Sequence, residues 1–580
     1  MPNSNDEVKE DNETRNKEAG IDVQSMSKSD NEPAVTPEFQ YGVQKAQAMT
    51  QVWTKENLIL AYVVIWLIQF IQGFSSGISS TLTPWVTSAF AEHSLTATTS
   101  IVSGLVGGLV KLPYAKLMDV WGRPQGFAIM VACATLGLIM MAGCNNVKTY
   151  CAAQVFYYVG YNGIDFTLTI FVADTSSLKN RAFLIAFMAT PWIATVWAYG
   201  PAAQSILSTI GFRWGFGVWA IVYPIVCAPL IALFIYNERK AKKAGLLPER
   251  VSSNRTAMQS IIYYCREFDV IGILLLATGL SLFLLSFSLY SYQTEQWKSP
   301  MIICFVIFGS LLIVAFALYE KYLAPVTFIP WTLLMDRTVF FTFTMVASIY
   351  LAWYLWDSYF YSFLIVVFNQ TVSQATYITN IYTVGACFWA VIVGIIIRYN
   401  GRLKWLSLYF GVPITILGVA LMIKFRQPDT NIGYIVMCQI FIAFGGGTLV
   451  ICEQMTVMAV SSQQNIPAIL AMEAMVANIG GSIGSTVAAA IWTGVFPNKL
   501  AKYLPASSQA DLATIYGSLT AQSSYPVGSP ARIAINHAYA DTQRLMLIAA
   551  TCLYSITLGS VILWKDVNVK KINQIKGIIF

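Results

Sequence analysis

Residues 115–125 read AKLMDVWGRPQ, and residues 394–404 read GIIIRYNGRLK. Each stretch closes an apolar run and contains a Gly-Arg pair, Gly122-Arg123 in the first and Gly401-Arg402 in the second. The distance along the chain between these pairs nearly equals the distance between two blocks of apolar runs, which start near residues 57 and 338. The sequence therefore predicts an internal repeat of two similar six-helix halves.

The composition places these halves in a membrane. Of the 580 residues, 56% are hydrophobic and 11% are charged, whereas an ordinary soluble domain has about 25% charged residues. This balance excludes a soluble globular protein, a disordered chain and a nucleic-acid-binding protein. An apolar run of about 20 residues can cross a bilayer as a helix. Fourteen such runs occur, at residues 57–78, 97–117, 126–144, 150–173, 183–206, 215–236, 268–290, 301–322, 338–366, 373–397, 403–423, 432–454, 467–493 and 544–564. The predicted fold is an all-α polytopic membrane protein.

The spans divide the chain into segments. We expect a disordered acidic tail at 1–54, a six-helix bundle at 55–236, a basic loop at 237–267, an extra helix pair at 268–322, a second six-helix bundle at 338–564 with an external loop at 496–543, and a short tail at 565–580. Basic residues concentrate on the cytoplasmic side of a membrane, and the 237–267 loop is the most basic one. Both termini are therefore predicted to be cytoplasmic. One loop disagrees, because Lys424 and Arg426 fall on the predicted outer side.

The turn around Asp119, Gly122 and Arg123 resembles the signature loop G-x-x-x-D-R-x-G-R-R/K of the major facilitator superfamily. It lies between the second and third spans, as that loop does, although Ala115 replaces the leading glycine and Val120 the first arginine. The resemblance implies a 14-helix (6+2+6) major facilitator fold. It also implies a conformational latch made by Asp119, Gly122 and Arg123, with Arg402 in the second copy. The alternative is a generic basic turn on the cytoplasmic side.

Within that superfamily, fourteen spans suggest either drug/proton antiporters or fungal siderophore–iron/proton symporters. The fourth span lacks the arginine of the antiporters, and Val196 and Gln204 stand where their fifth span has glycines. The string YPVGSPARIAINHAYADTQR, residues 525–544, closely resembles the loop before the last helix of the siderophore transporters. The chain is most similar to transporters of triacetylfusarinine C. We expect its external-loop residues to act as a gate or capture element, or else as a structural cover: Tyr525, Arg532, His537 and Tyr539.

The resemblance implies proton-coupled import of ferric hydroxamate siderophores. The expected location is the plasma membrane or endosomal vesicles. The expected partners are the siderophore, protons and the lipid bilayer, for a monomer that is not an enzyme, has no resident metal and carries iron only within its substrate. Two alternatives remain open, a multidrug/proton antiporter of the same fold and a non-transporting nutrient receptor.

Three spans carry polar or aromatic side chains at helical spacing, which places them on one face. Polar side chains in a membrane helix usually face a cavity or another helix. Ferric iron held by three hydroxamate anions is neutral, so its pocket needs aromatic walls and hydrogen-bond donors rather than a counter-charge. The predicted substrate-binding residues are Gln69, Gln72, Tyr158, Tyr161, Tyr350, Trp353, Tyr354, Asp357 and Tyr361. The alternatives are hydrogen bonds between helices and an aromatic belt at the interface.

Proton coupling requires a group that changes its protonation inside the membrane. A carboxylate at the centre of a span is costly and is therefore a functional candidate. The candidates for proton coupling are Asp165 in the fourth span, Asp357 in the ninth, Glu453 and Glu473, with Asp165 first and Glu473 second. Lys111 is expected to extend toward the cytoplasmic surface instead.

Overall fold

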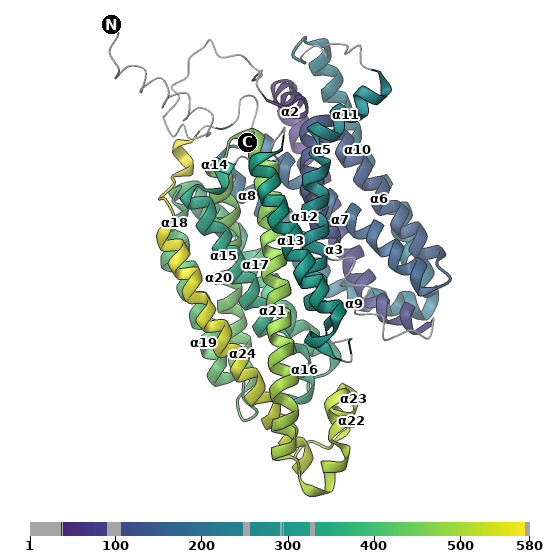
Figure 1. The fold of residues 1–580 in the computed structure, drawn as a ribbon, viewed down its shortest axis with the longest axis vertical. Coiled ribbons are helices and arrows are strands. Elements are labelled where there is room, and N and C mark those ends of the chain that lie inside the picture. The colour runs from purple at the N-terminus through teal and green to yellow at the C-terminus, as the bar shows by residue number, and fades with distance from the viewer. Residues whose placement is uncertain are drawn as a thin grey trace.

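The computed structural model describes residues 39–89, 106–247, 256–290, 295–324 and 331–572, together with Thr36, Gln293 and Gln574. Within these ranges the chain is helical, apart from loops and an isolated β-bridge between Arg402 and Asn568. Figure 1 shows most of the long helices running in one general direction. We call the face at the top of Figure 1 the tail face, because it carries the first described helix and the C-terminal end, and the opposite face the distal face.

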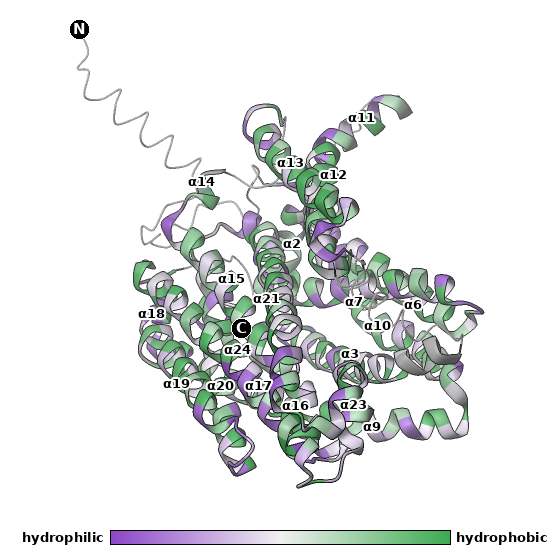
Figure 2. Cartoon of the chain, turned by 60° about the horizontal axis from the view of Figure 1, so that its bottom comes forward, coloured by the Kyte–Doolittle hydropathy of each residue, from purple (hydrophilic) through white to green (hydrophobic). Residues whose placement is uncertain are grey.

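Within the described ranges, the first half of the chain contains a series of helices. They are α2 (Tyr41–Val52), α3 (Lys55–Ala89), α5 (Lys111–Trp121), α6 (Arg123–Gly143), α7 (Val147–Thr175), α8 (Leu178–Ala189), α9 (Pro191–Thr209) and α10 (Gly211–Lys243). Next come α11 (Ala257–Glu267), α12 (Val270–Leu289), the short turn η3 (Gln296–Lys298) and α13 (Pro300–Tyr322). In Figures 1 and 2, α12 and α13 run side by side as a pair. Gly309 permits this contact, because a Cβ there would lie 2.7 Å from the backbone nitrogen of Phe283.

The second half repeats the pattern and adds a distal projection. Its helices are α14 (Trp331–Leu334), α15 (Arg337–Asp357), α16 (Phe360–Val366), α17 (Val372–Asn400), α18 (Leu403–Leu406), η4 (Ser407–Gly411), α19 (Val412–Phe425), α20 (Ile432–Ala459), η5 (Gln463–Asn465), α21 (Ile466–Tyr503), η6 (Ala506–Asp511), α22 (Leu512–Gly517), α23 (Leu519–Ser524), α24 (Pro530–Leu563) and η7 (Val569–Lys571). The segment from η6 to α23 forms the projection at the bottom of Figure 1.

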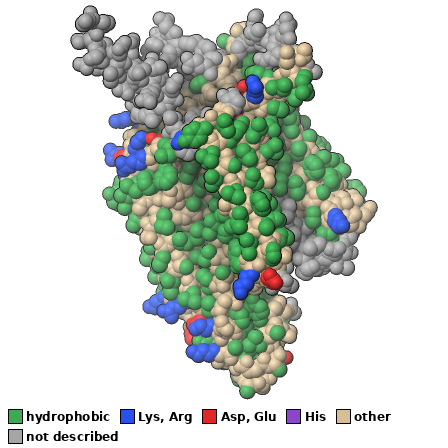
Figure 3. Space-filling model, in the orientation of Figure 1, with side chains coloured by type: hydrophobic (Ala, Val, Ile, Leu, Met, Phe, Trp, Pro, Cys, Tyr) green, Lys and Arg blue, Asp and Glu red, His purple; other side chains and the backbone are tan. Residues whose placement is uncertain are grey.

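Twelve helical segments in the described ranges are long and apolar enough to cross a membrane. Two predicted spans are not among the twelve. The 97–117 span contains α5 and begins with residues outside the described ranges, and the 150–173 span corresponds to α7. The count of fourteen therefore stays a prediction. Figure 3 shows apolar side chains over a broad middle surface, with the visible Lys and Arg gathered toward the ends of the helices. This distribution is what a bilayer-embedded protein requires.

Several predicted boundaries are wrong because apolar runs mark only the part of a helix that lies in hydrocarbon. The 1–54 tail contains α2, and α10 continues to Lys243 within the predicted 237–267 loop, which also contains α11. The predicted 496–543 loop is shorter, since α21 continues to Tyr503 and α24 begins at Pro530. Polar residues can extend a helix past the membrane without any change in its hydrogen bonding.

Two predicted continuous spans contain breaks. The 183–206 span is divided between α8 and α9 at Pro191, which lacks the N–H of a helical hydrogen bond. The 338–366 span is divided between α15 and α16 at Tyr359, whose φ of 61° is left-handed. These breaks change which side chains share a face.

The two halves approach each other closely at two glycines. The helical turn before α5 approaches α21 at Gly108, where an added Cβ would collide with the amide of Asn478. Helix α8 approaches α17 at Gly394, where an added Cβ would lie 2.5 Å from the Cα of Phe183. One apolar core extends across this contact, since it includes both Ala182 of α8 and Val393 of α17.

Candidate functional site

The predicted latch forms a turn between two helices. Helix α5 ends at Trp121 and α6 begins at Arg123, with Gly122 between them at φ 108° and ψ 162°. This conformation strongly favours glycine, because a Cβ would clash with the backbone. The turn places the Arg123 side chain inside the protein, where it is 1% exposed.

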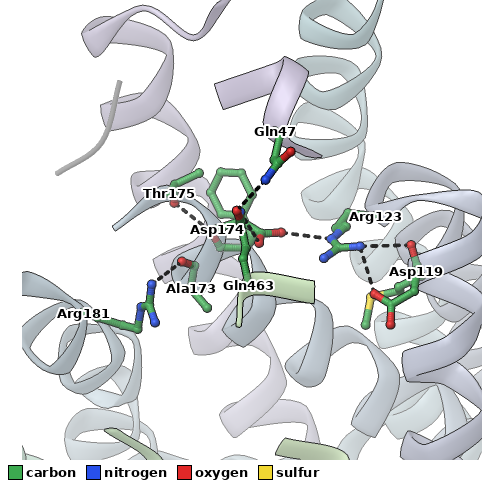
Figure 4. Close-up of polar contacts among 10 residues, drawn as sticks. Gln47, Asp119, Arg123, Ala173, Asp174, Thr175, Arg181 and Gln463 are labelled. Carbon is green, nitrogen blue, oxygen red and sulfur yellow. Dashed lines mark hydrogen bonds and ion pairs between the residues drawn. The ribbon is translucent and has the colours of Figure 1, made fainter. Parts of the chain in front are cut away.

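Arg123 joins the ends of three helices. Its Nε donates a hydrogen bond to Oδ2 of Asp174 at 2.9 Å, and its Nη1 donates to Oδ1 of Asp119 at 3.3 Å and to the carbonyl of Met118 at 3.1 Å. Figure 4 shows the guanidinium between the two carboxylates. The sequence pattern identified Asp119 and Arg123 but missed Asp174, which stands at the end of α7 with no motif around it.

The latch continues into the second half of the molecule. Gln463 of η5 donates from Nε2 to Oδ1 of Asp174 at 3.4 Å. Arg402, predicted as a latch residue, is not part of this network. It is exposed and lies in the β-bridge with Asn568. The second copy has Arg398 where the first has Asp119, so it lacks the acid that would hold an arginine in the turn.

A cavity of about 260 Å³ lies between the halves. It is lined by three of the four predicted proton-coupling carboxylates, Asp165, Glu453 and Glu473, together with Tyr350 from the predicted substrate-binding set. Asp357, at the end of α15, is not among the residues that line it. Its lining is Gly108, Lys111, Asn162, Asp165, Phe166, Thr169, Val346, Tyr350, Glu453, Gln454, Leu470, Glu473, Ala474, Ala477 and Asn478. The expectation that Lys111 reaches the surface is wrong, since it lines this cavity beside the acids.

The two glutamates of the cavity are deeply buried. Glu453 is 2% exposed and Glu473 is 5% exposed. One carboxylate oxygen of each, Oε2 of Glu453 and Oε1 of Glu473, has no hydrogen-bond partner among the described residues. An unsatisfied buried carboxylate is destabilising, so this arrangement is better explained by a role in binding than by packing.

The polar face of α3 contacts α7 beside this cavity. Gln69 donates from Nε2 to Oδ1 of Asp165 at 3.0 Å, and Gln72 donates from Nε2 to the carbonyl of Tyr161 at 3.1 Å. These are hydrogen bonds between helices, the alternative that the sequence left open for this face. Tyr158 and Tyr161 are partly buried on α7 and lie against the ring of Tyr157.

Comparison with known proteins identifies the architecture. Residues 65–485 match the family model described as Major Facilitator Superfamily. The chain belongs to the major facilitator superfamily. The MFS siderochrome iron transporter 1 of Ajellomyces capsulatus is 59% identical over 97% of this chain and 95% of the relative. The siderochrome iron transporter 2 of Aspergillus fumigatus is 44% identical over 94% of this chain and 90% of the relative. The siderophore iron transporter mirB of Emericella nidulans is 41% identical over 97% of this chain and 93% of the relative.

The solved structures agree at the level of the fold. A bacterial homologue of the iron transporter ferroportin, in an outward-facing state, superposes with a TM-score of 0.50 over 86% of this chain and 99% of its own, at 9% identity. The family model and the similar transporters confirm the predicted family and the assignment as a transporter rather than an enzyme.

The aromatic face of α15 is only partly as predicted in this major facilitator protein. Tyr350 and Trp353 have ring centroids 6.0 Å apart, and Trp353 stacks on Tyr382 of α17 at 5.6 Å. Tyr354 is 41% exposed. The sequence predicted that Tyr361 continues this face, but the break at Tyr359 places it on α16 instead.

One of the two basic residues that disagreed with the predicted orientation has a structural explanation. Arg426 is buried, donates from Nη1 to the carbonyl of Trp356 at 2.8 Å and lies 4.1 Å from the ring centroid of Phe360. It therefore supports the break between α15 and α16, close to Asp357 at the end of α15. A buried arginine of this kind does not report on membrane orientation.

The predicted external-loop residues divide into two groups. Arg532 and Tyr539 are 1% exposed and belong to α24, so their placement in a loop is wrong. Arg532 donates to the carbonyls of Val366 and Gln522 at 3.0 and 2.9 Å, and the Tyr539 hydroxyl donates to Oε1 of Gln522 at 2.7 Å. These bonds fasten the distal projection to α16 and α24.

The other two residues of that set lie nearer the surface. The Tyr525 hydroxyl donates to Oδ2 of Asp511 at 3.3 Å, and His537 is exposed on α24. In the described part of the chain, no three His, Cys, Asp or Glu side chains are arranged to hold a metal ion.

Proposed function

We propose that this transporter imports ferric hydroxamate siderophores across the plasma membrane together with protons. The observation that carries the proposal is the cavity between the halves, with its three carboxylates, in a chain that is 59% identical to a siderochrome iron transporter. The tail face is the cytoplasmic one, which agrees with the basic loops there. The protein works as a monomer without a resident cofactor, and iron travels only within its substrate.

The residues of the cavity suit both proton uptake and binding of the iron complex. Asp165, Glu473 and Glu453 supply oxygens that can take up protons, and Asp165 is the first candidate because Gln69 holds it beside the cavity. Tyr350, Trp353 and Tyr382 supply aromatic surface next to it. A neutral iron complex is suited to such a lining, because it needs apolar contact and few hydrogen bonds.

Transport then follows from alternating access. The first half, α3 to α10, and the second half, α15 to α24, move relative to each other around the cavity. In the present conformation α8 contacts α17 at Gly394, toward the tail face. Arg123, Asp119, Asp174 and Gln463 add a polar latch on that side.

The test is uptake of radiolabelled iron by cells that lack other siderophore routes. We expect uptake from a ferric trihydroxamate that rises as the external pH falls. Asp165→Asn should remove most of that pH dependence, whereas Asp429→Asn, a matched change at an exposed residue of the α19–α20 turn, should leave it unchanged.

The same assay separates the alternatives. If iron uptake by Asp165→Asn keeps its pH dependence, the proton-coupling role belongs to Glu473 or Glu453 instead. No siderophore-dependent iron accumulation, combined with increased drug resistance, would replace import with drug/proton antiport. Substrate-dependent signalling without iron accumulation would indicate a receptor.

A further inference from the structure

Helix α2 is buried although it is not apolar. Its sequence is YGVQKAQAMTQV, and most of its residues are buried, the polar Gln44, Lys45, Gln47 and Thr50 among them. A surface helix usually buries one stripe and exposes its polar side chains. Helix α2 is therefore inserted between other elements of the tail face rather than lying on it.

The contacts of α2 with the first half are close. Gly42 packs on the signature turn, where a Cβ would lie 2.6 Å from the carbonyl oxygen of Asp119. Lys45 forms an ion pair with Oε1 of Glu238 on α10 at 2.5 Å, and Lys240 donates to the carbonyl of Val52 at 2.8 Å. These interactions hold α2 against the latch and the end of α10.

One side chain of α2 reaches the second half. Gln47 donates from Nε2 to Oε1 of Gln463 at 3.0 Å, and Gln463 in turn donates to Asp174. Figure 4 shows the resulting series from Gln47 through Gln463 and Asp174 to Arg123. Gln47 and Gln463 are 3% and 4% exposed, so water does not readily replace these bonds.

The C-terminal end makes a second connection of the same kind. Arg181 of α8 donates from Nη1 to Oε1 of Gln574 at 3.0 Å. The Nε2 of Gln574 donates to the carbonyls of Met458 and Ser461, both at 2.6 Å. Gln574 thus joins the first half, through α8, to the tail-face end of α20.

We propose that α2 and Gln574 form a releasable clamp on the cytoplasmic gate, with Gln47 and Gln574 as its positioning residues. Both residues connect the two halves but belong to segments outside the six-helix bundles. Their bonds between the halves cannot survive separation of the tail-side helix ends, so they stabilise the closed state alone and shift the population toward it. Opening to the cytoplasm requires their release. The proposal assumes the alternating access and orientation proposed above.

The experiment measures access to the cavity from the cytoplasmic side, with no siderophore present. A reporter cysteine, Ala477→Cys, lines the cavity. Inside-out vesicles are treated with a membrane-impermeant maleimide, and labelling of the chain without the reporter is subtracted. Two variants weaken the clamp. Gln47→Leu removes the bond to Gln463, and Gly42→Ala displaces α2 from the signature turn. The matched control is Gly559→Ala, since a Cβ at Gly559 meets nothing within 4 Å.

We expect Gln47→Leu to raise the labelling rate about fivefold, the effect of losing one hydrogen bond of typical strength. Gly42→Ala should raise the rate at least as much, and Gly559→Ala should not change it. If Gly42→Ala fails to reach the membrane, Gln574→Leu replaces it, because that change removes bonds without adding volume.

Equal labelling rates in the parent, Gln47→Leu and Gln574→Leu, at equal amounts in the membrane, would overturn the clamp. Because labelling requires no substrate, its outcome is separate from that of the proposed import. Faster labelling in a chain that takes up no siderophore would leave the clamp standing and remove the import function.

Discussion

At the scale of single residues, the latch depends on Arg123 having two carboxylates and no access to water. The guanidinium and Asp174 form a buried ion pair at 2.9 Å, and Asp119 is the more distant second acid at 3.3 Å. Removing one partner of a buried ion pair leaves the other charge uncompensated, at a cost of about 3–5 kcal/mol. We therefore expect the loss of Arg123 to lower the free energy of unfolding more than the loss of an exposed arginine would.

We expect Arg123→Gln to lower the thermal unfolding temperature in detergent and to abolish siderophore-dependent iron uptake, because Asp119 and Asp174 then lose the guanidinium that joins them. The matched control is Arg402→Gln in the second Gly-Arg turn, where the side chain is exposed. Thermal unfolding and iron uptake are measured for both variants. Equal effects of the two changes would contradict the assignment of the latch to the first turn alone.

At the scale of elements, the start of α15 and the end of α24 are joined through their caps. Asp336 accepts hydrogen bonds from the backbone N–H of Thr338 at 2.8 Å and from Nζ of Lys565 at 2.6 Å. Burial alone would raise the pKa of Asp336, but these hydrogen bonds outweigh burial and hold its pKa below the ordinary value for an aspartate. The ionised carboxylate therefore stabilises the folded state.

The sign of the pH dependence follows from this lowered pKa. Since the folded-state pKa is below the unfolded one, the contribution of Asp336 is complete above about pH 4 and is lost as the pH falls further. We expect Asp336→Ala to destabilise the protein by about 1 kcal/mol at pH 7 and by less at pH 3.5. Thermal unfolding at both pH values checks this, with Asp566→Ala at an exposed site as the control. A constant difference across pH would exclude the carboxylate as the cause.

At the scale of the whole molecule, the two faces have different tasks. The tail face carries the latch, α2 and Gln574, and all of them connect the halves. The distal face carries the projection from η6 to α23, which Arg532 and Tyr539 fasten to the second half. This division fits a cytoplasmic gate on one side and an external surface on the other.

The orientation can be tested by glycosylation. Val527→Asn creates the acceptor Asn-Gly-Ser in the turn between α23 and α24 on the distal face, where Val527 is 68% exposed. We expect this variant to gain a glycan that peptide N-glycosidase removes. Lys570→Thr creates Asn568-Val-Thr on the tail face and should gain none. A glycan on Lys570→Thr and none on Val527→Asn would show that the membrane orientation is the opposite of the proposed one.

Sequence reasoning located the carboxylates but not their connections. Asp165, Glu453 and Glu473 were each identified because a charge in an apolar run is costly, and the structure places all three around one cavity. Asp174, Gln463 and Gln47 were missed, because polar residues at helix ends are common and carry no such signal. Arg532 and Tyr539 were assigned to a loop because α24 extends beyond the apolar run.

The sequence by itself determined the membrane class, the repeated halves and the family, because hydrophobic length and local motifs are properties of short continuous segments. It also determined that Gly122 must turn the chain, since few other residues adopt that conformation. Only the tertiary structure decided that Lys111 faces the acids, that Arg402 stands apart from the latch, and that α2 packs on the first half and bonds to the second through Gln47. These facts depend on contacts between residues hundreds of positions apart, which helix packing creates and no local pattern records.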